Sequence, residues 1–247
     1  MISRDELTAH LADYLRLADY QDYAPNGLQV EGKSEINTIV TGVTASQALI
    51  DEAIKLNADA ILVHHGYFWK SEPQEIVGFK QKRIKSLLLN DINLMGYHLP
   101  LDGHSELGNN AMLGKLWQLS DITPKPGLVR LGQLAQPMNI EDFIEVVASS
   151  LNRQPLHLPG GPTQIQTIAW CSGGAQGYID QALAWKADVY ISGEVSEQTT
   201  HLATEGGIHY LAAGHHATER LGIKALGEYL AQKFDLNCHF VDMPNPV

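Results

Sequence analysis

The sequence predicts an α/β protein made of two similar α/β domains from an internal duplication, with mostly parallel sheets covered by helices. An internal repeat and an alternation of apolar strands with amphipathic helices predict this fold. Residues 38–65 align without a gap on residues 167–194, and eight of the 28 pairs are identical. Average residue frequencies would give about two identities by chance. Both copies have the pattern strand, turn, helix and strand, so we expect one α/β unit twice.

An N-terminal helix is expected over residues 4–18, and Ser3 with Glu6 forms the capping box that opens it. Residues 22–27 contain Pro and Asn-Gly in succession, which predicts a turn. A short strand over residues 28–30 follows.

The first repeat then predicts a buried parallel sheet. β-branched residues predict a strand over residues 36–43, and an apolar stripe predicts a helix over residues 46–56. A nearly all-apolar run predicts a buried strand over residues 60–63. The next expected elements are a helix over residues 83–89, a strand over residues 92–97, a loop over residues 98–108 and a helix over residues 109–119.

Residues 123–161 are rich in Pro and Gly and contain one clear helix, over residues 140–151. We interpret this stretch as the crossing between domains at residues 1–125 and 126–247, with the C-terminal helix and strand packing back on the first domain. The second copy predicts a strand over residues 167–171, a turn at residues 173–174, a helix over 177–185, a strand over 189–191, a helix over 196–205, a strand over 208–212, a helix over 218–234 and a strand over 238–241.

Composition excludes several classes of protein. The formal charge is −11 with only 17 basic residues, which argues against non-specific nucleic-acid binding. Apolar runs fall far short of the ~20 residues of a membrane helix, so no membrane partner is expected. The N-terminus has no apolar signal segment, and Cys171 and Cys238 make no disulfide framework, so we expect a cytoplasmic protein.

Polar residues at strand ends form the first candidate site. His64 and His65 end the second strand of the first copy, where the second copy has Gly193 and Glu194. Ligands of open α/β sheets bind beyond the carboxyl ends of strands. Two ligands from one dipeptide require a bend, which Gly66 permits. The alternative is that two polar residues merely cap the strand.

Each half also contains an imidazole followed four residues later by a carboxylate: His98 with Asp102, and His215 with Glu219. These donors suit Zn, Mn, Fe or Ni, and paired copies suggest a metal site between the halves. His215 is expected in a loop and Glu219 in the first helical turn, where the helix dipole favours a carboxylate. His216 is the alternative to His215. Asp102 is a candidate ligand, and His98 is a ligand or a proton carrier.

Two neighbouring segments allow two interpretations each. Residues 67–70, Tyr-Phe-Trp-Lys, could stack a purine base and meet a phosphate, or could pack a domain or subunit interface. Glu194, Glu197 and Gln198 could line the cavity or belong to a capped helix start. No Walker motif and no Gly-x-Ser-x-Gly elbow occurs.

At these residues the chain resembles the YbgI-like dinuclear metal-binding family, named GTP cyclohydrolase 1 type 2 homologues. The matching segments are DYAPNGLQVEG (22–32), TGVTAS (41–46), ILVHHGYFW (61–69), YHLPLDGHSELGNN (97–110), SGEVSEQ (192–198) and GHHATER (214–220). The resemblance implies two α/β domains, a ring of six subunits, and two divalent metal ions per subunit. It implies as their ligands His64, His65, Asp102, His215 and Glu219, with Glu219 bridging.

The first functional hypothesis is a dinuclear metal-dependent hydrolase that acts on a nucleotide or similar small molecule through a metal-activated water, with His98 as catalytic acid or base. Guanine as the substrate rests on the family name alone, and no substrate-binding residue is assigned. The alternative is a non-catalytic, metal- or nucleotide-responsive binding protein assembled as a ring. A third possibility is that the metals only hold the two halves together.

Overall fold

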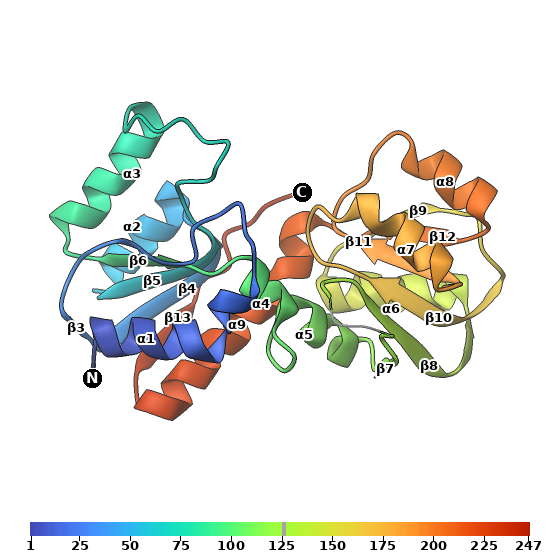
Figure 1. Ribbon diagram of the computed structural model, residues 1–247, viewed down its shortest axis with the longest axis horizontal. Helices are drawn as coiled ribbons and strands as arrows, with labels where there is room; N and C mark the ends of the chain where they lie inside the picture. The colour runs from blue at the N-terminus through green and yellow to red at the C-terminus, as the bar shows by residue number, and fades with distance from the viewer. Residues whose placement is uncertain (125–126) are drawn as a thin grey trace. The chain divides into compact units, whose positions relative to one another are not determined.

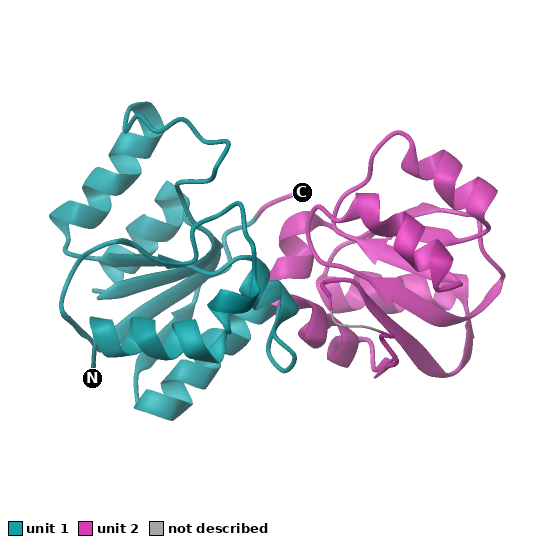
Figure 2. Ribbon diagram, in the orientation of Figure 1, with its two compact units in different colours: residues 1–108, 222–244 teal, residues 109–221, 245–247 magenta. Residues whose placement is uncertain are grey.

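A computed structural model describes residues 1–124 and 127–247, so the expected domain boundary at residues 125 and 126 lies outside the described residues. The chain forms two compact units, coloured separately in Figure 2. Unit 1 comprises residues 1–108 and 222–244, and unit 2 comprises residues 109–221 and 245–247. The expected α/β class is confirmed in both units.

Unit 1 contains a five-stranded sheet in the order β13-β4-β5-β6-β2. Four of its strands are parallel, and β2 pairs antiparallel with β6 at the edge. The strands are β2 (Gly27–Val30), β4 (Thr38–Thr44), β5 (Ala60–His65), β6 (Asn93–Gly96) and β13 (Asn237–Phe240). A separate two-stranded sheet pairs β1 (Ile2–Ser3) with β3 (Glu35–Ile36).

Helices cover both faces of this sheet, as expected for apolar parallel strands. In Figure 1, α1 and α9 lie on one face and α2 and α3 on the other. Alternate residues of β5 enter the two cores: Leu62 packs under α1 and α9, and Val63 packs under α2 and α3. The helices are α1 (Arg4–Tyr14), the 3-10 turn η1 (Leu17–Asp19), α2 (Gln47–Lys55), α3 (Gly78–Leu89), α4 (Leu99–Gly103) and the second part of α9 (His215–Phe234).

Unit 2 contains a six-stranded sheet in the order β7-β8-β10-β11-β12-β9. Only β10, β11 and β12 are parallel, and the other three pairings are antiparallel. The expectation of mostly parallel sheets therefore holds for unit 1 and is wrong for unit 2. The strands are β7 (Ser120–Asp121), β8 (Arg130–Asn139), β9 (Leu156–Leu158), β10 (Gln164–Trp170), β11 (Val189–Ser192) and β12 (His209–Ala212).

The helices of unit 2 also cover both sheet faces, with α5, α6 and the start of α9 on one and α7 and α8 on the other (Figure 1). They are α5 (Asn109–Leu116), α6 (Ile140–Leu151), the 3-10 turn η2 (Gln176–Tyr178), α7 (Ile179–Ala184) and α8 (Thr199–Gly206). No helix among the described residues is long and apolar enough to span a membrane.

Several boundaries differ from the sequence prediction. The expected loop over residues 98–108 contains α4, and the stretch 123–161 contains β8 and β9 as well as the expected helix. Helix α1 ends at Tyr14, four residues early, because Arg16 takes a left-handed backbone conformation. Helix α9 begins at His215, three residues earlier than expected.

One identical pair of the repeat has the same structural role in both units. The Asp59 carboxylate accepts hydrogen bonds of 2.9 Å from the backbone N–H groups of Asn37 and Thr38, where β4 begins. The Asp188 carboxylate accepts bonds of 2.8 Å from Gln166 and Thr167 in β10. Each aspartate thus joins the backbone of one strand to the chain that enters the next strand, which accounts for an aspartate at both positions.

Candidate metal centre

The carboxyl end of β5 carries His64 and His65. His64 is buried, and its Nδ1 lies 2.9 Å from the carbonyl oxygen of Tyr97. Its Nε2 lies 3.5 Å from a carboxylate oxygen of Asp102. His65 lies at the rim with Nδ1 3.2 Å from Thr44 Oγ1. The strand end therefore presents both imidazoles, each with Nδ1 close to an oxygen.

His98 follows β6 and precedes α4, the short helix that carries Asp102. Its Nδ1 lies 2.9 Å from Asp22 Oδ1. The Asp22 carboxylate also accepts hydrogen bonds from Asn26 and from the backbone of Leu99. Burial would raise the pKa of Asp22, but the bonds from His98 and Asn26 outweigh it and hold that pKa well below its usual range. Asp22 is therefore an ionised partner that fixes the His98 ring.

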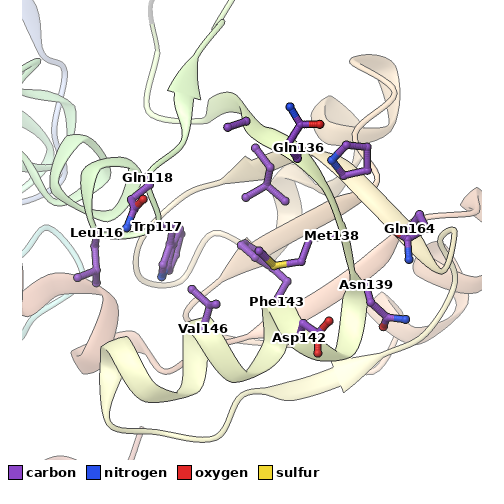
Figure 3. A pocket seen from close by; sticks show the side chains of 13 residues that line it. Leu116, Trp117, Gln118, Gln136, Met138, Asn139, Asp142, Phe143, Val146 and Gln164 are labelled. Carbon is purple, nitrogen blue, oxygen red and sulfur yellow. The ribbon is translucent and has the colours of Figure 1, made fainter.

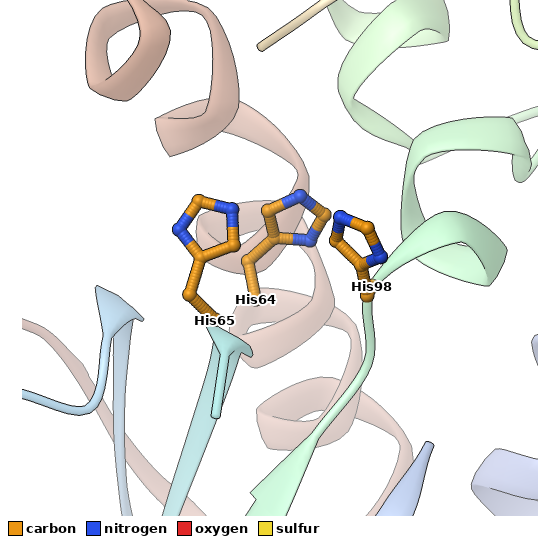
Figure 4. A group of neighbouring side chains, drawn as sticks. All are labelled: His64, His65 and His98. Atoms are coloured by element: carbon orange, nitrogen blue, oxygen red, sulfur yellow. The ribbon is translucent and has the colours of Figure 1, made fainter. Parts of the chain in front are cut away.

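These three histidines form one cluster, shown in Figure 4. Each offers a ligand nitrogen, and the three nitrogens lie within 4.8 Å of one another. The His98 ring centroid is 5.1 Å from that of His64 and 5.9 Å from that of His65. This arrangement brings His98, considered at the outset as a ligand or a proton carrier, directly among the predicted ligands.

Unit 2 presents a second donor pair on α9. His215 Nε2 lies 3.2 Å from Glu219 Oε2, one helical turn along. The expectation that His215 lies in a loop is wrong: it is the first residue of the helix, and the four-residue spacing places both side chains on one face. His216 donates its backbone N–H to the carbonyl of Val247, so the adjacent position is tied to the chain's last residues.

Glu194 completes this pair from the end of β11, where the repeat aligns it with His65. Its Oε1 lies 2.7 Å from His215 Nδ1. Burial would lower the pKa of His215, but Glu219 and Glu194 outweigh it and raise the pKa to about 9. Glu197 by contrast has an 89% exposed side chain, 3.7 Å from His201, and Gln198 precedes α8 at the N-cap position without a side-chain capping bond. Of the three polar residues singled out in this segment, Glu194 alone contacts a predicted ligand in the described chain.

Gly173, in the turn after β10, lies against both donors of unit 2. Its backbone has φ +66°, and a Cβ built there would lie 2.1 Å from Glu219 Oε1 and 3.2 Å from His215 Nε2. The Gly173 N–H donates to Thr218 Oγ1. Any larger residue would displace the carboxylate, so this glycine leaves the space that the donors occupy.

The four imidazoles share one feature that suits metal binding. In each of them Nδ1 lies within hydrogen-bond distance of an oxygen. The Nε2 atoms of His64 and His215 lie 3.5 and 3.2 Å from the carboxylates of Asp102 and Glu219. Metal-ligating histidines almost always hold their second nitrogen in this way. The sequence reasoning missed Asp22, Thr44 and Gly173 as supporting residues. Asp22 could have been suspected from the Pro and Asn-Gly turn that it opens, where its carboxylate accepts the backbone N–H of Ala24. Gly173 lies in the turn expected at residues 173–174, whereas Thr44 carries no local signal.

A groove of about 600 Å³ in unit 2, shown in Figure 3, contains none of the predicted site residues. It lies between the end of α5, β8 and α6, and both apolar and polar side chains line it. Its lining residues include Leu116, Trp117, Leu134, Met138, Phe143 and Val146. The histidines and carboxylates described above, rather than this groove, provide the candidate metal donors.

Comparison with known proteins shows likeness over the whole chain. The model of the Duf34/NIF3 (NGG1p interacting factor 3) family matches residues 2–246. Proteins named GTP cyclohydrolase 1 type 2 homolog are similar: that of Haemophilus influenzae is 59% identical over 230 residues, covering 91% of this chain and 92% of its own. That of Yersinia pestis is 53% identical over 242 residues, covering 98% of each chain.

Solved structures agree with this likeness. A protein described as ybgI, of unknown function, superposes with a TM-score of 0.97 at 52% identity over 100% of both chains. TTHA1606 from Thermus thermophilus gives a TM-score of 0.93 at 35% identity, again over 100% of both chains. HcgD from Methanocaldococcus jannaschii, in its reduced form, gives 0.86 at 26% identity over 98% of each. The resemblance inferred from the motifs is confirmed.

Proposed function

The chain belongs to the Duf34/NIF3 family, and from this premise and the donor geometry we propose that it is a dinuclear metal-dependent hydrolase acting on a nucleotide or a similar small molecule. The observation that carries the proposal is the cluster of three imidazole nitrogens within 4.8 Å in unit 1, each ring held at Nδ1. A structural role alone would not require three neighbouring imidazoles oriented in the same way.

The proposed ligands of the two divalent ions are His64, His65 and Asp102 from unit 1 with His215 and Glu219 from unit 2. Imidazole and carboxylate together suit Zn, Mn, Fe or Ni. Glu219 has two oxygens and is only 3% exposed, which supports it as the bridging ligand. Bound in such a site, divalent ions lower the pKa of water and polarise the bond to be cleaved.

His98 is the proposed acid or base. Asp22 accepts a hydrogen bond from His98 Nδ1, which leaves Nε2 as the atom that takes or gives a proton. Asp22 itself stays ionised because its pKa is depressed. The Asp22 and His98 pair thus resembles the base and orienting carboxylate of other hydrolytic sites, where the carboxylate fixes the tautomer.

Metal content and turnover test this proposal together. Freshly isolated protein should contain two divalent ions per subunit by elemental analysis, and it should hydrolyse at least one member of a panel of nucleotides, phosphoesters and pterin precursors. Glu219→Gln should lose most of the metal and the turnover. Glu197→Gln is the matched control, because the Glu197 side chain is 89% exposed.

Two results would overturn the hydrolase. Native protein without bound metal would remove the premise. Two metals with no turnover on the panel, and with metal- or nucleotide-dependent capture of a partner, would instead support a non-catalytic binding protein.

We also propose that the two α/β units descend from one duplicated unit and that six chains assemble into a ring. The shared roles of Asp59 and Asp188 support the duplication. The ring is supported by the family resemblance, and native mass spectrometry would check it.

A further inference from the structure

We propose that Tyr23 and Trp69 form an aromatic platform that stacks a planar heteroaromatic ring, such as the base of a nucleotide, beside His98. This inference rests on the proposed function only in taking the imidazole cluster as the reaction site. It names the class of ligand, which the metal donors leave open.

The two rings converge on the histidines of unit 1. The Trp69 ring centroid lies 4.9 Å from that of His98 and 5.8 Å from that of His65. The Tyr23 centroid lies 5.1 Å from His98 and 5.6 Å from Trp69. Both aromatic rings meet the His98 imidazole edge to face, at 73° and 72°. A flat ligand placed against them would therefore lie next to the proposed acid or base.

Polar contacts fix Trp69 in place and satisfy its polar atom. The indole Nε1–H donates to the carbonyl of Gly66, and the Trp69 backbone N–H donates to a carboxylate oxygen of Glu72. The backbone N–H of Lys70 donates to the carbonyl of Tyr23, which joins the two aromatic segments. A prepositioned indole with its N–H already bonded offers its π face, which is what base stacking requires.

The backbone before Trp69 is strained. Phe68 has φ +65°, a left-handed conformation that bulky residues rarely adopt. Such strain persists where the surrounding structure enforces it, and it gathers at ligand-binding sites. The preceding residue provides a contrast: Tyr67 is buried and donates its hydroxyl to Ala45, a packing role. The segment thus buries the Tyr67 ring and places the Trp69 ring beside the histidines.

Exposure distinguishes a platform from simple packing. Tyr23 is 54% exposed, although a large aromatic residue that served only to pack against His98 would be expected to bury most of its surface. An exposed aromatic ring beside convergent polar groups is typical of a ligand site. Stacking tolerates any planar base, because every base has a π face, so the platform selects a class of ligand rather than one base.

The binding of guanosine 5′-monophosphate and of ribose 5-phosphate to the intact chain tests the platform. Calorimetry measures both affinities with and without added Mn²⁺. NMR is recorded with and without Zn²⁺, because Zn²⁺ is diamagnetic. The nucleotide should bind at least ten times more tightly than the sugar phosphate, and it should shift the indole N–H resonance of Trp69. Trp69→Leu should weaken nucleotide binding at least tenfold and leave sugar phosphate binding and metal stoichiometry unchanged. Tyr23→Leu should weaken it less, and Trp69→Phe should retain most of it.

Trp185→Leu is the matched control, because Trp185 is a partly buried tryptophan packed in the core of unit 2. It should bind the nucleotide as the unmodified chain does. Equal affinity for the two ligands, or unchanged nucleotide affinity in Trp69→Leu, would overturn the platform. Metal binding with turnover, but without a preference for aromatic ligands, would overturn the aromatic platform and leave the proposed hydrolase standing. Aromatic binding in a protein that holds no metal would support the platform while the proposed hydrolase fails.

Discussion

At the scale of single residues, the candidate site depends on the atoms that hold each imidazole as much as on the imidazoles. His64 is oriented by a backbone carbonyl, His65 by a hydroxyl, and His98 and His215 by carboxylates. A carboxylate partner makes an imidazole more basic than a neutral oxygen does. The four rings are therefore not equivalent, because two are held at Nδ1 by a carboxylate and two by a neutral oxygen.

Gly173→Ala tests the space kept for the unit 2 donors. The added Cβ would lie 2.1 Å from Glu219 Oε1, and φ +66° disfavours alanine. We expect metal affinity to fall by about 10–100-fold, as for other changes that displace a ligand's support. Metal content per subunit after dialysis would measure it. Gly177→Ala is the control, since a Cβ there meets nothing within 4 Å. Equal metal content in both variants would contradict the role of Gly173.

Asp59 gives a pH-dependent prediction. Burial would raise its pKa, but Lys33 and the N–H groups of Thr38 and Asn37 outweigh it and lower the pKa below its ordinary value of 3.8. Because the folded pKa is the lower one, the ionised carboxylate stabilises the fold above pH 3.8, and this contribution disappears as pH falls through the folded pKa.

Asp59→Asn should therefore lower the free energy of unfolding by about 1.5–3 kcal/mol at pH 7, the range for hydrogen bonds to a charged group. The difference from the unmodified chain should shrink below pH 3.8. Urea unfolding at several pH values would measure both effects, with the exposed Asp51→Asn as control. A difference that stays constant down to pH 3 would show that ionisation of Asp59 is not the cause.

Residue types were predictable from the sequence where the chemistry is specific, and supporting residues were not. His98 with Asp102 and His215 with Glu219 stand out because an imidazole and a carboxylate recur at matched positions of the repeat, and His64 and His65 stand out because they end an apolar strand. Asp22 reaches His98 across 76 residues of sequence, so no local pattern connects the two. Thr44 similarly meets His65 only because β4 and β5 are paired.

At the scale of elements, the sequence predicted all five strands of the unit 1 sheet and the parallel strands β10, β11 and β12 of unit 2, whereas β7, β8 and β9 were missed. β8 and β9 lie in a stretch where Pro and Gly suggested a loop. Pro137 is tolerated in β8 because β7 pairs only with Gly132 and Gln133, which leaves that part of the strand at an edge. Antiparallel edge strands need no crossover helix, so the alternation that revealed the parallel core gave no signal for them.

The edge strand β9 gives an element-scale prediction. His157 Nε2 lies 3.0 Å from His209 Nδ1, and His209 Nε2 lies 3.0 Å from the carbonyl of Pro162. Burial and the neighbouring His209 lower the pKa of His157 below 6.5, while Glu141 acts weakly in the opposite direction. The neutral form therefore favours the fold above pH 6.5, and this contribution is lost as pH falls through the lowered pKa.

Acidification should consequently loosen β9. Hydrogen exchange of Leu156–Leu158, corrected for the intrinsic pH dependence, should accelerate as pH falls from 7.5 to 5, while α6 stays unchanged. His157→Gln keeps an N–H donor toward His209 but cannot titrate, so its β9 should show little pH dependence. The same acceleration in that variant would assign the effect to another group.

At the scale of the whole molecule, each unit has its own apolar cores on both faces of its sheet. The donors lie at strand and helix ends, outside these cores. This organisation bears on whether bound metal serves chemistry or only stability. A small structural metal site folds its domain outright, because no core exists without it. Units of this size, with helices on both faces, can hold their fold by hydrophobic burial.

Removing metal should therefore abolish turnover without unfolding the protein. After chelation, the far-UV circular dichroism spectrum should be unchanged and unfolding should remain cooperative. The midpoint temperature of unfolding should fall only by the amount that corresponds to the lost free energy of metal binding. Turnover and the binding of an aromatic ligand can then be compared in the same sample. Turnover should be lost. Aromatic ligand binding should be retained, because the chain's own hydrogen bonds hold Tyr23 and Trp69. Loss of secondary structure on chelation would instead mean that the donors serve to hold the fold together.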